Sequence, residues 1–529
     1  MRDAAGHDEA GVSRRQLLAA GGLALGGVAL AGAGGLPRLL DGADAATHRF
    51  RAPLTFPPEL TGSDLTIPIR EAEVAILPGR KTRMWTYDGS FPGPTIRRPA
   101  GETTRVSFEH RLPASVGELS VHLHGGHNSS DDDGQPGGLT DLQPNAFYCD
   151  VSGDLSARES GNDLLLAPGG RRTYTYEGTE NGGPERAAFQ WYHDHRLERT
   201  AQNVWNGLAG MWILEDEFDA ALPLPRGERD LPLMIGDRSF RADNQLEQPF
   251  GDGGSSLNPP GDGLVGRRVL VNGCASPYHR VKGCRYRLRL LNNSNFQPYN
   301  LYLTGGVKMV QIGSDSGLMP RPVVRKRLLL GPGERAEVIV DFSAAAGERV
   351  QLRSGARRSA GKGAAESFEG ALMEFRVGAA IADETSIPAT LRPLPSWVSK
   401  ARQKPSHRWK IAIGGAFLPR WVINKRSYDP AYTDVTVKLG ETATWEIQNA
   451  SGTSHLFHLH HTDWYMLSRN GRTPRPWERC LKETFLLDPG ERVVVAGHFS
   501  DHPGKFVVHC HMLDHEDHGL MSQFEVAPA

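Results

Sequence analysis

The sequence predicts an all-β protein built from three tandem β-sandwich domains. The chain holds 61 glycines and 36 prolines and a formal net charge of −1, a composition typical of many strands joined by tight turns. A Pro-Gly turn followed by a β-rich segment also occurs three times, at a spacing of roughly 160 residues. A repeat of that length indicates a repeated domain rather than a solenoid unit.

The three turns share a pattern of Leu, Pro, Gly and Arg. They lie at residues 166–171, 330–335 and 487–492, and each precedes a segment rich in Val, Ile, Tyr or Thr. Pro-Gly favours a turn and these residues favour a strand. Alternating segments at residues 285–291 and 444–447 support the sandwich prediction.

A second element repeats ahead of each turn, at residues 121–125, 301–305 and 457–461. Histidines occupy this strand in the first and third copies. Tyr302 and Thr304 occupy it in the second. The middle domain is therefore predicted to keep the fold without metal-binding side chains. The repeat places the domains at residues 46–218, 219–390 and 391–529.

The N-terminus is predicted to be a twin-arginine export signal over residues 1–45. Arg14 and Arg15 precede an apolar run at residues 17–31, and residues 43–45 form a small-x-small cleavage site. The alternative is a membrane anchor, but the run is shorter than the roughly 20 residues of a spanning helix. We expect a secreted, extracytoplasmic protein without stable membrane insertion. No long basic run argues for nucleic acid.

Four short segments carry half of the 20 histidines and one cysteine. They contain His122 and His124; His193 and His195; His455, His458 and His460; and His509, Cys510, His511 and His515. Because side chains alternate along a strand, Cys510 would face one way and both neighbouring histidines the other. The thiolate would then bind one metal and the imidazoles others, with a short covalent path for electrons between them.

These segments resemble the signature of the multicopper oxidases, the laccase-like three-domain enzymes. Residues 271–273, 285–289 and 311–315 resemble the branch of bacterial spore-coat laccase, bilirubin oxidase and phenoxazinone synthase. The resemblance implies three cupredoxin-like Greek-key domains and four copper ions: one type 1, one type 2 and two type 3. It implies that the type 1 copper lies in domain 3 and the trinuclear cluster between domains 1 and 3.

The resemblance also assigns the ligands. Cys510, His455 and His515 match the type 1 copper; His122 and His458 match the type 2 copper; His124, His193 and His511 match one type 3 copper; His195, His460 and His509 match the other. A thiolate with two imidazoles suits copper in an electron-transfer site. Zinc is the rival on ligand type, but ten histidines with one cysteine are not a closed structural zinc set.

The fourth type 1 position departs from the related enzymes, which usually place a methionine five residues after the last histidine. Here that position is Leu520, and Met521 follows it. Strand alternation would turn Met521 to the opposite face, so we expect a non-coordinating Leu520. The alternative is a one-residue slip that brings Met521 to the metal.

Two carboxylates match, by position, groups that related enzymes use to relay protons to dioxygen. Glu516 follows the ligand His515 directly, and Asp133 follows the first histidine segment. Both are predicted to be catalytic. The alternative for Asp133 is a solvated loop, because residues 129–134 are mostly serine and aspartate.

The four remaining cysteines are Cys149, Cys274, Cys284 and Cys480. In an exported protein they could form two disulfides, Cys274 with Cys284 and Cys149 with Cys480, or stay as free buried thiols. The sequence leaves both outcomes open.

The favoured function is a laccase-like oxidase that couples one-electron oxidation of phenolic or other aromatic donors to reduction of dioxygen to water. The alternative is an oxidase of cuprous, ferrous or manganous ions, which the ten unclustered methionines argue against. A structural protein that has lost its ligands is a second rival, but all eleven matching side chains are present. The sequence selects neither the physiological reductant nor the oligomeric state.

Overall fold

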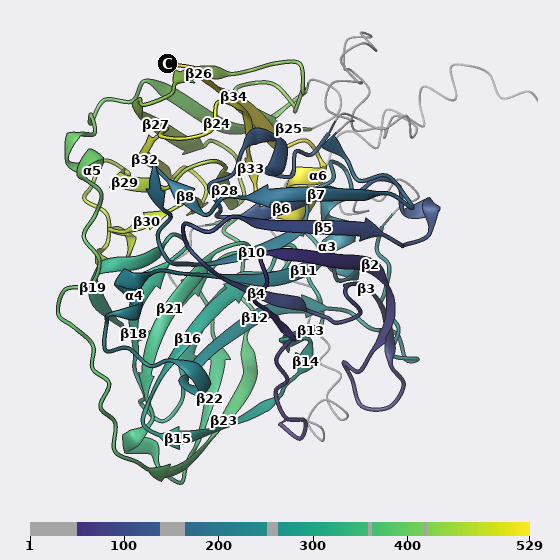
Figure 1. Cartoon of the computed structure of the whole chain (residues 1–529), viewed down its shortest axis with the longest axis vertical. Coiled ribbons are helices and arrows are strands. Elements are labelled where there is room, and N and C mark those ends of the chain that lie inside the picture. Colours follow the sequence, from purple (N-terminus) through teal and green to yellow (C-terminus); the bar gives the residue numbers. More distant parts are fainter. Residues whose placement is uncertain (1–49, 138–163, 251–262, 358–361, 416–419) are drawn as a thin grey trace, which may run out of the picture. The chain divides into compact units, whose positions relative to one another are not determined.

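The computed structural model describes residues 50–137, 164–250, 263–357, 362–415 and 420–529. The predicted export signal lies outside these residues and stays a prediction. In the described part, the strands form three pairs of sheets and one short two-stranded sheet (Figure 1). Each of the paired sheets contains strands of one pair only. The prediction of an all-β protein is confirmed.

The first pair of sheets has the strand orders β3-β2-β5-β7 and β1-β4-β11-β10-β6. The strands are β1 Glu59–Leu60, β2 Asp64–Val74, β3 Thr82–Tyr87, β4 Gly93–Pro99, β5 Thr104–His110, β6 Val121–His124, β7 Arg171–Tyr176, β10 Ala188–Asp194 and β11 Ala209–Glu215. Ile67, Val106, Tyr174 and Trp212 belong to one apolar core between the sheets, as in a sandwich. The short β8 (Thr179–Glu180) and β9 (Gly183–Pro184) pair with each other.

The second pair has the orders β14-β13-β12-β16-β21-β18-β19 and β15-β23-β22-β17-β20. The strands are β12 Asp230–Arg238, β13 Arg268–Val271, β14 Cys274–Ala275, β15 Tyr278–Gly283, β16 Arg285–Asn292, β17 Tyr299–Leu303, β18 Met309–Ser314, β19 Gly317–Arg325, β20 Leu328–Leu330, β21 Arg335–Asp341, β22 Arg349–Ser354 and β23 Gly370–Ala380. Leu288, Val338, Leu352 and Phe375 pack in its core.

The third pair has the orders β25-β24-β27-β32-β29-β30 and β26-β34-β33-β28-β31. The strands are β24 His407–Gly414, β25 Arg420–Ile423, β26 Val435–Lys438, β27 Thr442–Asn449, β28 His455–Leu459, β29 Trp464–Arg469, β30 Leu481–Lys482, β31 Thr484–Leu487, β32 Arg492–His498, β33 Gly504–Cys510 and β34 Met521–Ala527. Trp409, Trp445, Trp464 and Phe524 pack in its core. The domain boundaries near residues 218 and 390 stay predictions.

Helices are short. The α-helices are α3 Thr200–Asn206, α4 Glu217–Ala220, α5 Ser396–Lys400 and α6 Leu513–Asp517, and the 3-10 helices are Ala114–Val116, Ser130–Asp132, Gly227–Arg229, Ser343–Ala345 and Pro476–Glu478. The Asp517 carboxylate accepts hydrogen bonds from the backbone N–H groups of Thr200 (3.0 Å) and Ala201 (2.8 Å). Through this contact α6 of the third sandwich holds the start of α3 from the first.

The predicted threefold repeat is present. The strands β7, β21 and β32 each follow a Pro-Gly turn, and the second repeated element begins within β6, β17 and β28. The turn glycines Gly169, Gly333 and Gly490 have φ angles of 76°, 79° and 78°. Only glycine adopts this left-handed conformation at little cost, which explains why all three copies keep it.

The structure shows one of the two outcomes that the sequence left open for Cys274 and Cys284. Both are buried free thiols. Cys274 Sγ instead lies 3.1 Å from Thr55 Oγ1, on a separate segment. Cys480 is also a free thiol, and Cys149, its candidate partner, lies outside the described residues.

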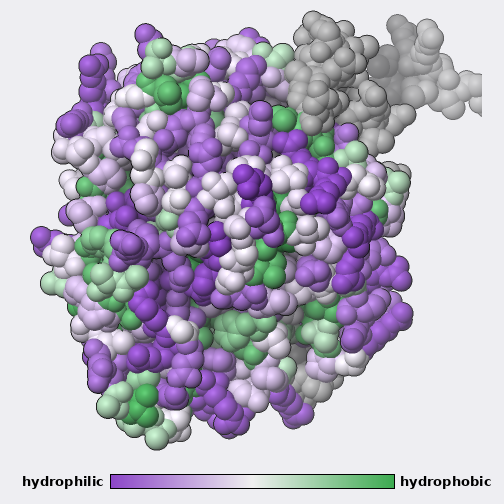
Figure 2. Space-filling view, in the orientation of Figure 1, coloured by the Kyte–Doolittle hydropathy of each residue, from purple (hydrophilic) through white to green (hydrophobic). Residues whose placement is uncertain are grey.

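Hydrophilic residues cover most of the face seen in Figure 2, and hydrophobic residues form small separate groups. Large exposed apolar side chains, such as Phe56, Val324 and Ile413, are scattered along the chain. Such single residues are normal on a protein surface. Among the described residues, no helix has the length and apolarity needed to cross a membrane.

The repeated turn allows a matched test of packing. A Cβ added at Gly333 would lie 2.9 Å from the His511 ring, whereas a Cβ at Gly490 would meet nothing within 4 Å. In both Gly→Ala variants the free energy of unfolding should fall by about 1–2 kcal/mol, because alanine is strained at a left-handed φ. In Gly333→Ala it should fall by about 1–3 kcal/mol more, because the added methyl group overpacks the contact with His511. Urea unfolding measures both, and equal losses would contradict the close contact with His511.

Candidate metal centre

The four histidine segments lie at neighbouring ends of two sandwiches. In the first sandwich, β6 and β10 pair so that His122 is opposite His193. In the third, β28 and β33 pair so that His458 is opposite His509. Opposite residues in an antiparallel pair share a face. All ten histidines and Cys510 are buried, with at most 2% of any residue exposed.

Cys510 faces the apolar core of the third sandwich. Its Sγ lies 3.5 Å from His455 Nδ1 and 3.6 Å from His515 Nδ1. His455 comes from β28 and His515 from α6. Burial raises the pKa of Cys510 to about 12 and lowers the pKa of His455 to about 3. Two neutral imidazoles therefore face a thiol that needs a nearby cation to ionise.

Leu520 and Met521 lie on opposite sides of their strand. Leu520 is fully buried in the apolar cluster that contains Cys510, and its carbonyl accepts a 3.0 Å hydrogen bond from the Cys510 N–H. Met521 is opposite His509 in register and packs in another cluster, with Leu197 and Tyr428. The structure thus places the leucine on the cysteine side and the methionine away from it.

The other eight histidines form a second group. Three triads each have ring nitrogens within 4.8 Å of one another: His122, His124 and His458; His124, His193 and His511; His195, His460 and His509. His460 Nε2 lies 3.3 Å from His195 Nε2 and 3.1 Å from His509 Nε2. The last two triads are the sets that the resemblance assigns to the type 3 coppers, and His122 lies with His458 as assigned to type 2.

Backbone carbonyls orient several of these rings. His122 Nδ1 lies 2.5 Å from the Asp133 carbonyl, His193 Nδ1 lies 2.8 Å from the Asp194 carbonyl, and His458 Nδ1 lies 3.2 Å from the Glu483 carbonyl. An N–H donated at Nδ1 leaves the lone pair on Nε2. In His124 the roles of the two ring nitrogens are reversed, because Nε2 lies 3.2 Å from a Glu483 carboxylate oxygen and Nδ1 is left with the lone pair.

The atoms left without hydrogen bonds test whether a metal fits. They include His122 Nε2, His124 Nδ1, His193 Nε2, His458 Nε2 and both ring nitrogens of His511. Buried polar atoms are rarely left unpaired, so this group is unusual as protein alone. Burial lowers the pKa of His193 to about 3 and of His195 to about 4. Neutral nitrogens with free lone pairs, and one sulfur nearby, fit copper ions.

Asp133 is buried, so the solvated-loop alternative is wrong. Its Oδ2 lies 2.7 Å from His460 Nδ1, and its Oδ1 lies 3.5 Å from His122 Nδ1. Only 1% of the residue is exposed. Burial raises the pKa of Asp133 well above its usual value, and a hydrogen bond from Asn128 partly opposes this. The carboxyl group is therefore placed to hold a proton.

Glu516 contacts two histidines of one triad. Its Oε2 lies 2.9 Å from His509 Nδ1, and its Oε1 lies 3.2 Å from His195 Nδ1. Burial alone would raise the pKa of Glu516, but His509 and His195 outweigh burial and hold it below its usual value. Because α6 carries both residues, His515 reaches Cys510 while Glu516 reaches the histidine triad.

Sequence reasoning missed Glu483. Besides its contact with His124, its carboxylate pairs with Arg335 and accepts a 3.1 Å hydrogen bond from Ser316 Oγ. Burial raises the pKa of Glu483 to about 7, although Arg335 opposes the shift. Glu483 lies between β30 and β31, outside every histidine segment, so no local motif marks it.

Two tryptophans contact the histidines. Trp191 stacks on His193 with ring centroids 4.2 Å apart. Trp421 was not singled out from the sequence. Its ring lies 4.6 Å from His455 and 4.7 Å from His515, so one indole covers both imidazoles beside Cys510.

The comparisons with known proteins identify the family. The chain matches the family described as Multicopper oxidase over residues 68–148 and 399–529. It is 32% identical to a laccase of Bacillus subtilis (strain 168), over 84% of this chain and 90% of that protein. It is 30% identical to the cell division protein FtsP of Escherichia coli (strain K12), over 98% of this chain and 99% of that protein.

Solved structures show the same architecture. A crystal structure of a multicopper oxidase from Pediococcus acidilactici is 29% identical and superposes with a TM-score of 0.74, over 90% of this chain and 91% of that chain. The three sandwiches are therefore cupredoxin-like domains. By sequence identity over most of its length, this chain belongs to the multicopper oxidase family, a family of copper-dependent oxidoreductases.

Proposed function

We propose that the chain is a laccase-like enzyme that oxidises phenolic or other aromatic donors one electron at a time and reduces dioxygen to water. One observation carries the proposal. Cys510 is bonded through the backbone to His509 and His511, while its own side chain faces His455 and His515. One strand end therefore joins a thiol site to the histidine triads, as the division between donor oxidation and dioxygen reduction requires.

The residues would hold about four copper ions. Cys510, His455 and His515 would hold the type 1 ion, with Leu520 beside it as a non-coordinating side chain. The type 2 ion would lie between His122 and His458; one type 3 ion between His124, His193 and His511; and the other between His195, His460 and His509. Copper bound in this way would supply one-electron redox chemistry and a site for dioxygen.

The chain's own groups orient the histidine rings and supply protons. The carbonyls of Asp133, Asp194 and Glu483 hold three rings in the tautomer that leaves Nε2 free. Asp133 carries the raised pKa of a buried acid, so it can hold a proton at a carboxylate oxygen beside His460. Glu516 keeps an ionised carboxylate that can accept a proton beside His195 and His509.

Steady-state turnover and metal content test the proposal. We expect about four coppers per chain, absorbance in the orange-red, and oxygen uptake that is faster with a diphenol than with a cuprous complex. Cys510→Ser should lose the absorbance and the diphenol turnover because it removes the thiol whose Sγ lies 3.5 Å from His455 Nδ1 and 3.6 Å from His515 Nδ1. Cys480→Ser, which changes another buried free thiol, is the matched control and should keep both.

Faster turnover of the cuprous complex would replace aromatic donors with metal ions as the substrate class. A protein that binds no copper would contradict the enzymatic role altogether. Wild-type activity in Cys510→Ser would contradict the role of the thiol.

The axial position gives a second prediction. Leu520→Met would place a thioether on the side of Cys510, and we expect the reduction potential of the bound type 1 ion to fall because sulfur donation stabilises the cupric state. Met521→Leu removes a thioether from the opposite face and should leave the potential unchanged. A redox titration measures both, and a shift in Met521→Leu alone would show that the side chains exchange places.

The two acids give a third prediction. Asp133→Asn and Glu516→Gln should slow reoxidation of the reduced enzyme by roughly 10²-fold or more, the usual contribution of a positioned acid or base. The orange-red absorbance should stay intact, because neither residue contacts Cys510. Stopped-flow mixing with dioxygen measures the rate.

Asp132→Asn is the control, since the Asp132 carboxylate accepts a 3.2 Å hydrogen bond from Ser129 Oγ in its own turn. Unchanged reoxidation in both acid variants would rule out a proton relay through these groups.

A further inference from the structure

A cavity of about 810 Å³ lies between the second and third sandwiches. Its walls come from β17, β20 and β22 on one side and from β29, β30 and β31 on the other. None of the eleven residues matched to copper lines it. The cavity therefore contains none of the matched copper ligands, although Arg335 in its wall pairs with Glu483 beside His124.

The walls are rich in cations. They contain Arg325, Arg327, Arg335, Arg353, Arg357, Arg469, Arg475 and Lys482. Four of these are neutralised by carboxylates: Arg335 by Glu483, Arg357 by Asp488, Arg469 by Glu478 and Glu491, and Lys482 by Glu334. These pairs use every acidic residue of the walls except Glu369.

The other four guanidinium groups belong to Arg325, Arg327, Arg353 and Arg475. None has a carboxylate within 4 Å among the parts of the chain that the structure describes. Arg325 donates instead to Gln311 Oε1, at 2.5 Å, and Arg353 donates to Gln351 Oε1, at 2.9 Å. With Glu369 as the single unpaired acid, the cavity carries an excess of positive charge.

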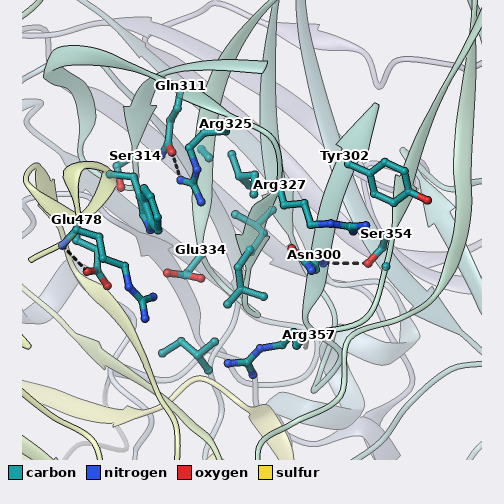
Figure 3. Close-up of a pocket in the computed structure, with 18 of the residues that line it drawn as sticks. Asn300, Tyr302, Gln311, Ser314, Arg325, Arg327, Glu334, Ser354, Arg357 and Glu478 are labelled. Atoms are coloured by element: carbon teal, nitrogen blue, oxygen red, sulfur yellow. Dashed lines mark hydrogen bonds between the residues drawn. The ribbon is translucent and has the colours of Figure 1, made fainter. Parts of the chain in front are cut away.

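These four groups lie in two pairs, each beside an aromatic ring. The Arg325 and Arg475 guanidinium carbons lie 4.1 and 5.9 Å from the centre of the Trp477 ring. The Arg327 guanidinium carbon lies 4.3 Å from the Tyr302 ring. Arg353 is opposite Tyr302 in the register of β17 and β22. Figure 3 shows Arg325 and Glu478 toward one side of the cavity and Arg327 and Tyr302 toward the other.

Apolar side chains also line the cavity. They are Leu329, Leu486 and Phe485. An aromatic ring under a guanidinium group fixes its plane. A fixed guanidinium plane matches the two oxygens of a carboxylate, which it can bind through two parallel hydrogen bonds.

We propose that this cavity binds an aromatic dicarboxylate, with one carboxylate at Arg325 and Arg475, the other at Arg327 and Arg353, and the ring system over the apolar middle. The ligand neutralises the excess positive charge and replaces water on Leu329 and Leu486. Binding at this site requires no transfer of electrons, so the ligand need not be a donor of the oxidase.

Isothermal titration calorimetry of the copper-loaded protein with biphenyl-4,4′-dicarboxylate tests the proposal. This probe has no phenolic hydroxyl, so it does not act as a laccase donor. We expect saturable binding at one site per chain. Biphenyl-4-carboxylate and inorganic phosphate should each bind at least about tenfold more weakly, because each can engage only one pair of arginines.

Arg327→Gln and Arg475→Gln should each weaken binding of the dicarboxylate about tenfold, the equivalent of about 1.4 kcal/mol. Both side chains are exposed, so folding should survive the change. The matched control is Arg349→Gln, which removes one charge from the same strand as Arg353 but outside the cavity. The affinity of Arg349→Gln for the dicarboxylate should equal that of the wild type.

The proposal is overturned if the wild type shows no saturable binding of the dicarboxylate. It is also overturned if the monocarboxylate or phosphate binds equally well, or if Arg349→Gln weakens binding as much as the cavity variants do. Oxidase turnover of a diphenol, measured on the same samples, reports separately on the proposed function. Loss of that turnover would leave the binding result intact.

Discussion

The histidine cluster depends on the seam between the first and third sandwiches, because neither sandwich supplies enough ligands alone. Arg335 is one residue that holds this seam. Its guanidinium group donates to the Phe189 carbonyl of the first sandwich (2.9 Å) and to the Asp315 carbonyl of the second (3.0 Å), and it pairs with Glu483 of the third. A buried charge of this kind is stable only when its hydrogen bonds are satisfied, so the three sandwiches must meet in one arrangement.

This contact explains what the middle sandwich contributes although it carries no matched ligands. The arginine of the repeated Pro-Gly turn is exposed in the first and third copies, as Arg171 and Arg492, but buried in the second, as Arg335. From that position it pairs with Glu483, which in turn contacts His124. Asn295 acts in a similar way, because it donates to the Ala201 carbonyl of α3 and accepts from the Leu513 N–H of α6.

Local patterns were enough to predict the strand segments and the repeat, whereas the resemblance to a family supplied the sets of histidines. Strand alternation separates Cys510 from His509, and His-x-His spacing places two rings on one face, so these features are set by neighbours in the chain. Long-range contacts were not predictable in the same way. Glu483 and Arg335 lie 148 residues apart and meet only in the folded chain. The contact of Cys274 with Thr55, 219 residues away, is another example.

Cys510 and its chain neighbours His509 and His511 lie in environments of opposite polarity. Cys510 lies in an apolar core, where burial disfavours the thiolate, so only a bound cation can make the ionised form stable. His509 and His511 lie among polar groups, where Glu516 supplies negative charge. The strand pleat maintains this difference without any loop or hinge, because side chains one residue apart point to opposite faces. A one-residue slip would exchange Leu520 with Met521 and move His509 into the apolar core. The burial of both faces therefore fixes the register on which the proposed electron path depends.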